Sequence, residues 1–216
     1  TRRQLKTWSI RRCDALRRAW HRDMNDNFFA EQLLFIDETR RNGKSLRRRY
    51  GRCPKGIVPV HISMPTTGKD HSILAMCATT GIVEHFTVEG GFGSDLFLAA
   101  FKEMFVQHIQ PFPAANSVLV LDNCSIHHTY YDELIELVRA RGGLVFFLPP
   151  YSPDYAPIES MFGLFKAWLK RHGGEWGAPG FNMHAFIRRG FEECVTAEQA
   201  PRLYRNCGYV LEADGE

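Results

Sequence analysis

Two short, mostly apolar runs that each end in an aspartate constrain the fold of this chain most. One run covers residues 32–36 and ends at Asp37, and the other covers residues 118–121 and ends at Asp122. Runs of this length are too short for a helix and are typical of strands that are buried on both faces. We therefore expect a buried strand that ends at Asp37 and a central strand that ends at Asp122.

The segments around these strands predict a mixed sheet. After Asp122, a helical pattern begins with Thr129 as a cap and stops at Gly142-Gly143, and residues 144–148 form another apolar run. A strand, a helix and a strand in this order imply a parallel pair with a right-handed crossover. Upstream, residues 72–79 and 82–88 read as two strands of a hairpin, which adds antiparallel pairing.

Helical periodicity also marks residues 4–22, residues 182–195, and a segment that starts with Ser94 as its N-cap and stops at Pro111. A further helix should begin with Pro157 as its first residue, which places Glu159 in its first turn. The tail from residue 201 shows no clear period. A chain of 216 residues with 44% hydrophobic residues can bury one substantial core, so we expect one domain with a tail.

Basic residues are concentrated in the first quarter of the chain. Residues 1–55 contain 16 Lys and Arg against 6 Asp and Glu, whereas the rest contains 11 against 18. A charge run is often only a solvated face, but the dominance of arginine favours contact with a polyanionic backbone. One cluster consists of Arg2, Arg3, Arg11, Arg12, Arg17, Arg18 and Arg22. The other follows Asp37 and consists of Arg40, Arg41, Lys44, Arg47, Arg48, Arg49, Arg52 and Lys55.

The sequence also limits where the protein works. No stretch approaches the roughly 20 apolar residues of a membrane span, and the arginine-rich N-terminus lacks the apolar core of a signal peptide. The six cysteines form no C-x-x-C pair. We therefore expect a protein that is neither secreted nor bound to a membrane, in the nucleus of a eukaryote or in the cytoplasm and nucleoid of a bacterium.

Asp37, Asp122 and Glu159 lie where a sheet could bring them together. Crowded carboxylates raise one another's pKa, so such a cluster is costly unless divalent cations neutralise it. Oxygen-only ligands favour Mg²⁺ or Mn²⁺ over zinc, and two such ions about 4 Å apart can catalyse direct displacement at a phosphodiester. Each acid also has a structural explanation: loop amides for Asp37, capping of a turn for Asp122, and the helix dipole for Glu159.

Two motifs, LVLDNCSIHH and VFFLPPYSPDYAPIESMFGLFK, resemble the catalytic core of mariner-type DDE transposases, in the branch related to bacterial insertion sequences. The resemblance extends upstream through LLFIDET and SILAMCATTGIVEHF, so it covers roughly residues 30–172. It implies a ribonuclease H-like α/β fold, which is a mixed sheet with helices on both faces. It also implies a DNA endonuclease and strand transferase that acts by direct displacement at phosphodiesters.

The resemblance assigns roles to individual residues. The metal-binding acids of the family fall on Asp37, Asp122 and Glu159, which would hold two Mg²⁺ or Mn²⁺ ions. Asn123 and His127 lie beside the second acid, where they could contact a hydrated metal ion or a DNA phosphate, although His127 could instead close a turn. The implied partners are double-stranded DNA, as transposon ends and target, and a second copy of the chain, because transposition joins two ends.

The sequence departs from the family at two points. The family commonly has asparagine before PIE, where it would cap the helix of Glu159, but this chain has Ala156, and losing a cap costs about 1 kcal/mol. The family also carries helix-turn-helix modules that recognise transposon ends, whereas residues 1–28 can form at most a basic helical linker or a remnant. We assign residues 29–175 to the catalytic domain and residues 176–216 to a C-terminal helix and tail packed on it.

Two alternative functions stay open at this point. A domesticated DNA-binding protein would keep the fold without strand transfer; the intact acids argue against it, while Ala156 and the missing recognition modules argue for it. Another ribonuclease H-like nuclease would cut RNA hybrids or branched DNA. Loss of metal-dependent nicking in an Asp122→Asn variant would identify an enzyme, and cleavage of a hybrid in preference to duplex DNA would favour the second alternative.

Overall fold

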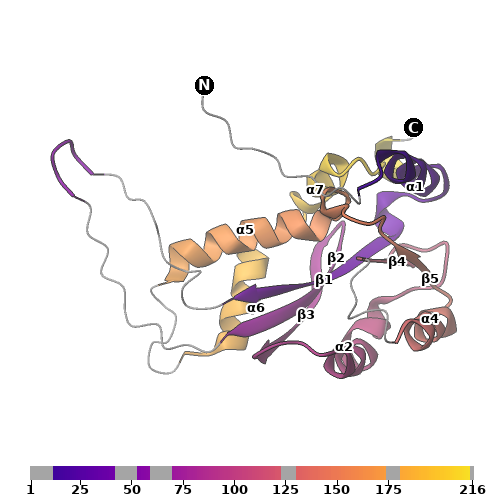
Figure 1. Ribbon diagram of the computed structural model, residues 1–216, viewed down its shortest axis with the longest axis horizontal. Helices are drawn as coiled ribbons and strands as arrows, with labels where there is room; N and C mark the ends of the chain where they lie inside the picture. The colour runs from indigo at the N-terminus through magenta and orange to yellow at the C-terminus, as the bar shows by residue number, and fades with distance from the viewer. Residues whose placement is uncertain (1–11, 42–52, 59–69, 123–129, 174–180, 215–216) are drawn as a thin grey trace.

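The computed structural model describes residues 12–41, 53–58, 70–122, 130–173 and 181–214. Its strands form one sheet in the order β3-β2-β1-β4-β5 (Figure 1). The strands are Leu33–Arg41 (β1), His71–Ala78 (β2), Gly81–Glu89 (β3), Val118–Leu121 (β4) and Leu144–Phe147 (β5). The two runs that end in an aspartate therefore lie side by side at the centre of the sheet, as β1 and β4.

The directions of the strands confirm that the sheet is mixed. β2 is antiparallel to both β1 and β3, so residues 71–89 form the predicted hairpin. On the other side, β4 runs parallel to β1, and β5 runs parallel to β4. In the register of β1 and β4, Ile36 lies opposite Leu121, so Asp37 and Asp122 come next on the two chains. Asp122 follows β4 as predicted, but Asp37 does not end its strand, because β1 continues to Arg41 through antiparallel pairing with β2.

Helices and shorter turns surround the sheet. The α-helices are Asp14–Asn27 (α1), Ser94–Ala100 (α2), Tyr131–Ala140 (α4), Pro157–His172 (α5), Met183–Cys194 (α6) and Ala200–Asn206 (α7). The shorter turns are Ala30–Gln32 (η1), Phe101–Phe105 (η3), Val106–His108 (η4), Pro153–Tyr155 (η5) and Glu212–Asp214 (η7). Within the described ranges, no helix has the length and apolar character needed to cross a membrane.

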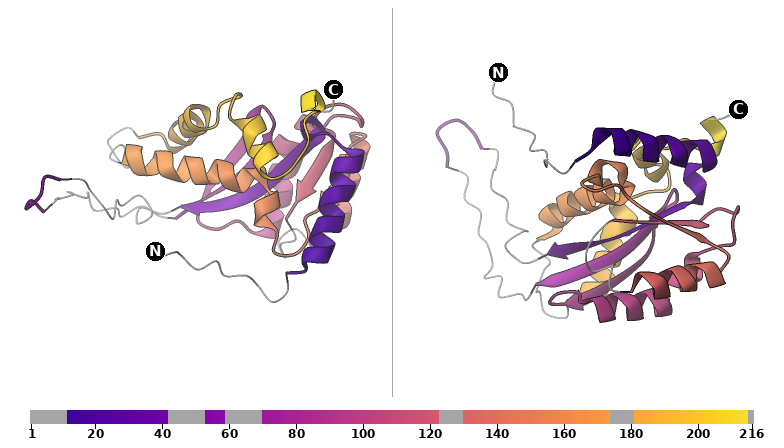
Figure 2. Two further views of the ribbon diagram at one scale, coloured as in Figure 1. Left: turned by 90° about the horizontal axis from the view of Figure 1, so that it is seen from above. Right: turned by 45° about the vertical axis from the view of Figure 1, so that its right-hand side comes forward.

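Alternation of side chains along the strands divides the core into two layers. Leu33 and Phe35 of β1 pack with residues of α5, α6 and α7, whereas Leu34 and Ile36 pack with residues of α2 and α4. Figures 1 and 2 show helices on both faces of the sheet, with α5 along one face and α2 and α4 beneath the other. The layer under α5 is the one that positions the candidate site.

Two predicted helices differ in the structure. The single helix expected from Ser94 to His108 consists of α2, a π turn and a 3-10 turn, and Gly93 rather than Ser94 is its N-cap. The π turn contains Phe101 and Phe105, both fully buried, so tertiary packing overrides helical propensity there. Within the described residues, the helix predicted over residues 4–22 begins at Asp14 and continues to Asn27.

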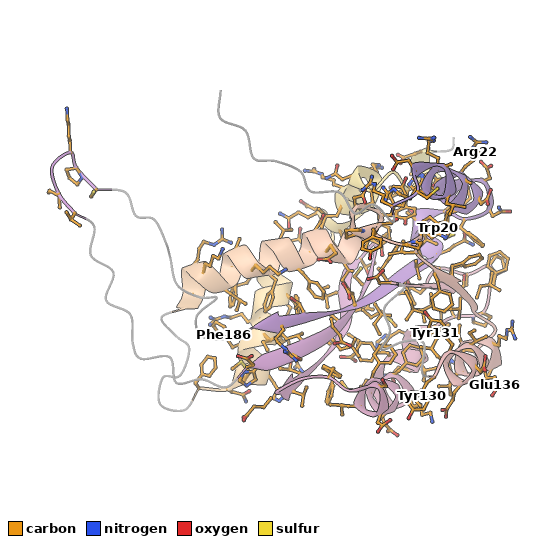
Figure 3. All side chains as sticks on the ribbon, in the orientation of Figure 1. Trp20, Arg22, Tyr130, Tyr131, Glu136 and Phe186 are labelled. Atoms are coloured by element: carbon orange, nitrogen blue, oxygen red, sulfur yellow. The ribbon has the colours of Figure 1, made fainter. Side chains whose placement is uncertain are left out.

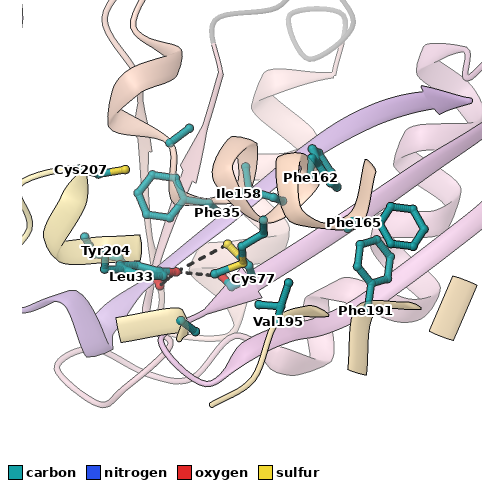
Figure 4. Close-up of a cluster of buried hydrophobic side chains, with 14 of the residues drawn as sticks. Leu33, Phe35, Cys77, Ile158, Phe162, Phe165, Phe191, Val195, Tyr204 and Cys207 are labelled. Atoms are coloured by element: carbon teal, nitrogen blue, oxygen red, sulfur yellow. Dashed lines mark hydrogen bonds between the residues drawn. The ribbon is translucent and has the colours of Figure 1, made fainter. Parts of the chain in front are cut away.

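The sequence does not predict α7, because this segment shows no helical periodicity and one buried aromatic residue cannot define one. Tyr204 anchors this helix to the sheet. Its hydroxyl lies 3.1 Å from the carbonyl oxygen of Leu33 and 3.2 Å from that of Cys77 (Figure 4). Tyr204 therefore bonds the C-terminal part of the chain to the beginning of β1 and the end of β2.

Candidate active site

Asp37 and Asp122 lie at the same edge of the sheet because β1 and β4 are parallel and in register. Side chains alternate along a strand, so Asp37 lies on the same face as Phe35. By the same argument, Asp122 lies on the same face as Val120. Both apolar neighbours belong to the core layer beneath α5. The two carboxylates therefore share the face of the sheet that α5 covers.

α5 brings the third acid to this edge. As predicted, Pro157 is the first residue of the helix and Glu159 lies in the first turn. The structure places all three acids around one pocket, whose apolar walls are formed by Phe35, Ile36, Val120, Leu148, Pro153, Ala156 and Ile158. Asp37 is half-buried, whereas Asp122 and Glu159 are exposed. The pocket thus has an apolar floor and an acidic rim.

The pocket is small. Its cavity volume of about 20 Å³ is room for about one water-sized sphere, so neither a nucleotide nor a side chain fits inside it. A polymeric substrate would therefore meet the exposed carboxylates at the rim rather than enter the pocket.

Asp37 has an unusual protonation equilibrium. Burial raises the pKa of Asp37 from 3.8 to about 7. The backbone N–H of Glu38 donates a hydrogen bond of 2.7 Å that lowers this pKa, and the charges of Glu159 and Asp122 raise it further. The three carboxylates are therefore close enough to repel one another. A divalent cation between them would favour the charged form of Asp37 and lower its pKa.

The donor chemistry of the pocket suits Mg²⁺ or Mn²⁺, because its polar side chains offer carboxylate oxygens. Across the part of the chain that the structure describes, no three Asp, Glu, His or Cys side chains are already grouped tightly enough to hold a metal ion. Like charges repel, so carboxylates spread unless a cation draws them together. The three acids fit a divalent cation by residue type and by their shared pocket, and binding would require their side chains to converge.

The predicted DNA-binding residues are only partly described. Arg40 is exposed, and its guanidinium lies against Gly91, where an added Cβ atom would be 2.6 Å from a terminal nitrogen. Arg41 ends β1. Outside the described residues lie Lys44, Arg47, Arg48, Arg49, Arg52, Asn123 and His127. The contacts of these residues with DNA or metal stay predictions.

Sequence reasoning missed two sets of residues around the site. Leu148 and Pro153 belong to the pocket floor; the apolar run at 144–148 and the proline-rich connector after it were the available signals. The assignment of Arg17 to a phosphate-binding cluster is also wrong, because its side chain is buried and paired with Asp154. Nothing in the local sequence distinguishes this buried arginine from the other arginines of the cluster.

Comparison with known families identifies the chain. The model of the DDE superfamily endonucleases matches residues 32–175. The chain belongs to this family. The matched segment contains Asp37, Asp122 and Glu159, and it leaves α1, α6 and α7 outside. No curated protein matches the chain.

Solved structures share the fold of this endonuclease domain. The Mos1 strand transfer complex has a TM-score of 0.57 at 16% identity, over 98% of this chain and 68% of the Mos1 chain. The Mos1 mariner paired end complex with Mn has a TM-score of 0.54 at 16% identity, over 99% and 67%. The corresponding complex with Mg has a TM-score of 0.53 at 15% identity, over 100% and 67%. The family match confirms the prediction of a DDE endonuclease domain, and the shared fold confirms the ribonuclease H-like architecture.

Proposed function

We propose that this endonuclease domain cuts and joins DNA strands as the catalytic part of a transposase, with Asp37, Asp122 and Glu159 holding two Mg²⁺ or Mn²⁺ ions. The observation that carries the proposal is the pocket beside the C-terminal end of β4 that all three acids line. The proteins of similar fold support the substrate, because the Mos1 structures are a strand transfer complex and paired end complexes.

Each residue has a distinct task in this proposal. The half-buried Asp37 and the exposed Asp122 and Glu159 would hold the cation together at the acidic rim of the pocket. When bound, two divalent cations activate a water or a 3′-hydroxyl and stabilise the leaving oxygen of a phosphodiester. Because the pKa of Asp37 is about 7, cation binding at lower pH releases a proton from this carboxyl, and metal affinity should increase as the pH rises towards 7.

The proposal extends to partners and domain limits. We propose that the basic residues after Asp37 bind double-stranded DNA. We also propose that two copies of the chain act together, because transposition joins two DNA ends. We propose residues 29–175 as the catalytic domain, residues 1–28 as a basic linker, and residues 176–216 as a C-terminal helix and tail.

The test is Mn²⁺ binding followed by nicking of supercoiled plasmid DNA. Calorimetry should detect Mn²⁺ binding and electrophoresis should detect Mn²⁺-dependent nicking in the native chain, and both should be lost in Asp122→Asn. The matched control is Asp132→Asn, which removes an exposed carboxylate from α4 and should behave like the native chain. DNA binding without nicking would favour the domesticated binding protein, and faster cleavage of an RNA–DNA hybrid than of duplex DNA would favour another nuclease.

A further inference from the structure

The turn that leads into α5 has no side-chain cap of its own. Ala156 occupies the N-cap position and its side chain accepts no hydrogen bond. The N–H groups of Tyr155 and Ala156 bond within the turn, to the carbonyl oxygens of Ser152 and Pro153 at 3.0 and 3.1 Å. A short turn bonded to itself does not fix its position relative to the sheet, so that position depends on contacts with other elements.

Arg17 of α1 supplies such a contact. Its side chain is 4% exposed, and its two terminal nitrogens donate to the two carboxylate oxygens of Asp154 at 3.0 and 2.6 Å. One of them also lies 3.4 Å from the carbonyl oxygen of Tyr151, and the guanidinium carbon lies 4.2 Å from the centre of the Tyr155 ring. A single planar group thus contacts the turn at three points, with a bidentate geometry that lysine does not provide.

Two properties of the turn agree with this contact. Tyr151 has a φ of 55°, a left-handed conformation that a residue other than glycine keeps only where its surroundings impose it. Burial raises the pKa of Asp154, but the hydrogen bonds and the charge of Arg17 outweigh burial, so this pKa lies below its usual value. The turn is therefore shaped around a charged arginine.

The same turn is held from a second direction by the C-terminal part of the chain. The hydroxyl of Tyr209 donates to the carbonyl oxygen of Tyr155 at 2.7 Å. The Tyr155 ring also packs against Trp20 and His21 of α1, with ring centres 6.1 and 4.6 Å apart, and a ring nitrogen of His21 lies 2.9 Å from the carbonyl oxygen of Cys207. Figure 3 shows Trp20 on the side of α1 that faces the body of the molecule.

We propose that Arg17 is a positioning residue for Glu159: through Asp154 and Tyr155 it fixes the start of α5, and so the distance of the third carboxylate from the two aspartates of the sheet. This inference rests on the proposed function of the pocket. Arg17 contacts no reacting atom and acts through the turn. It also lies outside the matched segment 32–175, so this chain supplies the contact from a part of its sequence that the family model does not cover.

The test compares Arg17→Gln with Arg139→Gln, which removes the same charge from an exposed position of α4. The measured quantity is the Mn²⁺ concentration that gives half-maximal plasmid nicking. We expect Arg17→Gln to raise this concentration about tenfold, as loss of a supporting contact does in metal sites, and Arg139→Gln to leave it unchanged. Asp154→Asn should give a smaller increase, because the contacts of Arg17 with Tyr151 and Tyr155 remain, and the double variant should show no more than Arg17→Gln alone.

Hydrogen exchange separates this inference from the proposed function. Amides of residues 158–161 should exchange about tenfold faster in Arg17→Gln than in the native chain or Arg139→Gln, whether or not Mn²⁺ is added. If the native chain shows no response to Mn²⁺, the proposed function fails, while the exchange rates still decide the role of Arg17. Unchanged exchange, or a lower unfolding temperature with an unchanged Mn²⁺ requirement, would overturn the positioning role.

Discussion

The sheet and the turn before α5 hold the acids of the site in different ways. Asp37 lies within β1 and Asp122 directly follows the parallel strand β4, so backbone hydrogen bonds and strand register set their distance. Glu159 depends on side-chain contacts from α1 and from the C-terminal segment, which lie far from it in sequence. Two acids are thus placed by the regular backbone of the core, and the third by a few specific contacts that a point mutation can remove.

The largest effect should come from removing a carboxylate, either on the sheet or at the start of α5. We expect Asp37→Asn and Glu159→Gln each to lower Mn²⁺-dependent nicking by at least about 1,000-fold, because a catalytic metal ion supplies several kcal/mol of transition-state stabilisation. Plasmid nicking at saturating Mn²⁺ measures the loss. Glu136→Gln, an exposed change on α4, should retain native activity, and an active Glu159→Gln would remove this residue from the site.

The second effect concerns Asp37 on the sheet and appears as a pH dependence of the free energy of unfolding. The pKa of Asp37 is raised to about 7 in the folded chain, so folding favours its protonated form. In the presence of a chelator, the free energy of unfolding should therefore fall as the pH rises from about 4 to 7, by up to about 4 kcal/mol, at about 1.4 kcal/mol per pKa unit.

Urea unfolding at several pH values measures this dependence, and Asp37→Asn should reduce it to the contributions of Glu38, whose pKa burial raises, and His85, whose pKa burial lowers. Asp154 and Asp214, whose pKa values are lowered, contribute stability that is lost only at pH values below this window. A native chain with constant stability between pH 4 and 7 would show that Asp37 is not in the buried environment described above.

A third prediction concerns how the body of α5, rather than its start, is held. Gly190 of α6 lies against α5 so closely that an added Cβ would be 2.6 Å from the Phe165 ring and 2.9 Å from the Trp168 ring. Gly190→Ala should therefore destabilise the chain by about 1–3 kcal/mol through overpacking. Gly163→Ala is the matched control, since nothing lies within 4 Å of its Cβ, and it should stabilise the helix by up to about 1 kcal/mol.

Urea unfolding compares the two glycine variants directly. Equal effects of the two changes would mean that α5 and α6 do not approach each other as the structure has them.

A fourth prediction tests the bond between α7 and the sheet. Tyr204→Phe should destabilise the chain by about 1–2 kcal/mol, because the buried carbonyl oxygens of Leu33 and Cys77 lose their donor. Tyr130→Phe removes an exposed hydroxyl that bonds Asp95 and should cost less than about 0.5 kcal/mol. Thermal unfolding measures both, and a Tyr204→Phe variant as stable as the native chain would contradict the anchoring role.

The smallest expected effect tests whether Arg17 takes the place of the missing cap at Ala156. Ala156 has the extended backbone of an N-cap residue, so Ala156→Ser can add the missing cap. In the native chain the gain should be below about 0.5 kcal/mol, because Arg17 already holds the turn. In the Arg17→Gln background the gain should approach about 1 kcal/mol. Urea unfolding of the four chains measures this coupling, and equal gains in both backgrounds would show that the two devices are independent.

The sequence predicts the sheet side of the site well and the turn side poorly. The run before Asp37 and the run before Asp122 carry a local signal, and the chain order of the elements then fixes the parallel pair. The pairing of Arg17 with Asp154 joins residues 137 positions apart, so no local pattern contains it. With Ala156 before α5, the sequence predicts a loosely held helix, because it shows the missing cap but not the tertiary contacts that replace the cap.

The bond from Tyr209 to the turn before α5 also has a consequence for synthesis. A ribosome releases the chain from its N-terminus onward, so β1, β4 and α5 leave the exit tunnel before residue 209. A nascent chain that has reached α5 already carries Asp37, Asp122 and Glu159, but it lacks Tyr204 and Tyr209. In the proposed site, the third carboxylate would therefore reach its final position only after residue 209 has left the exit tunnel.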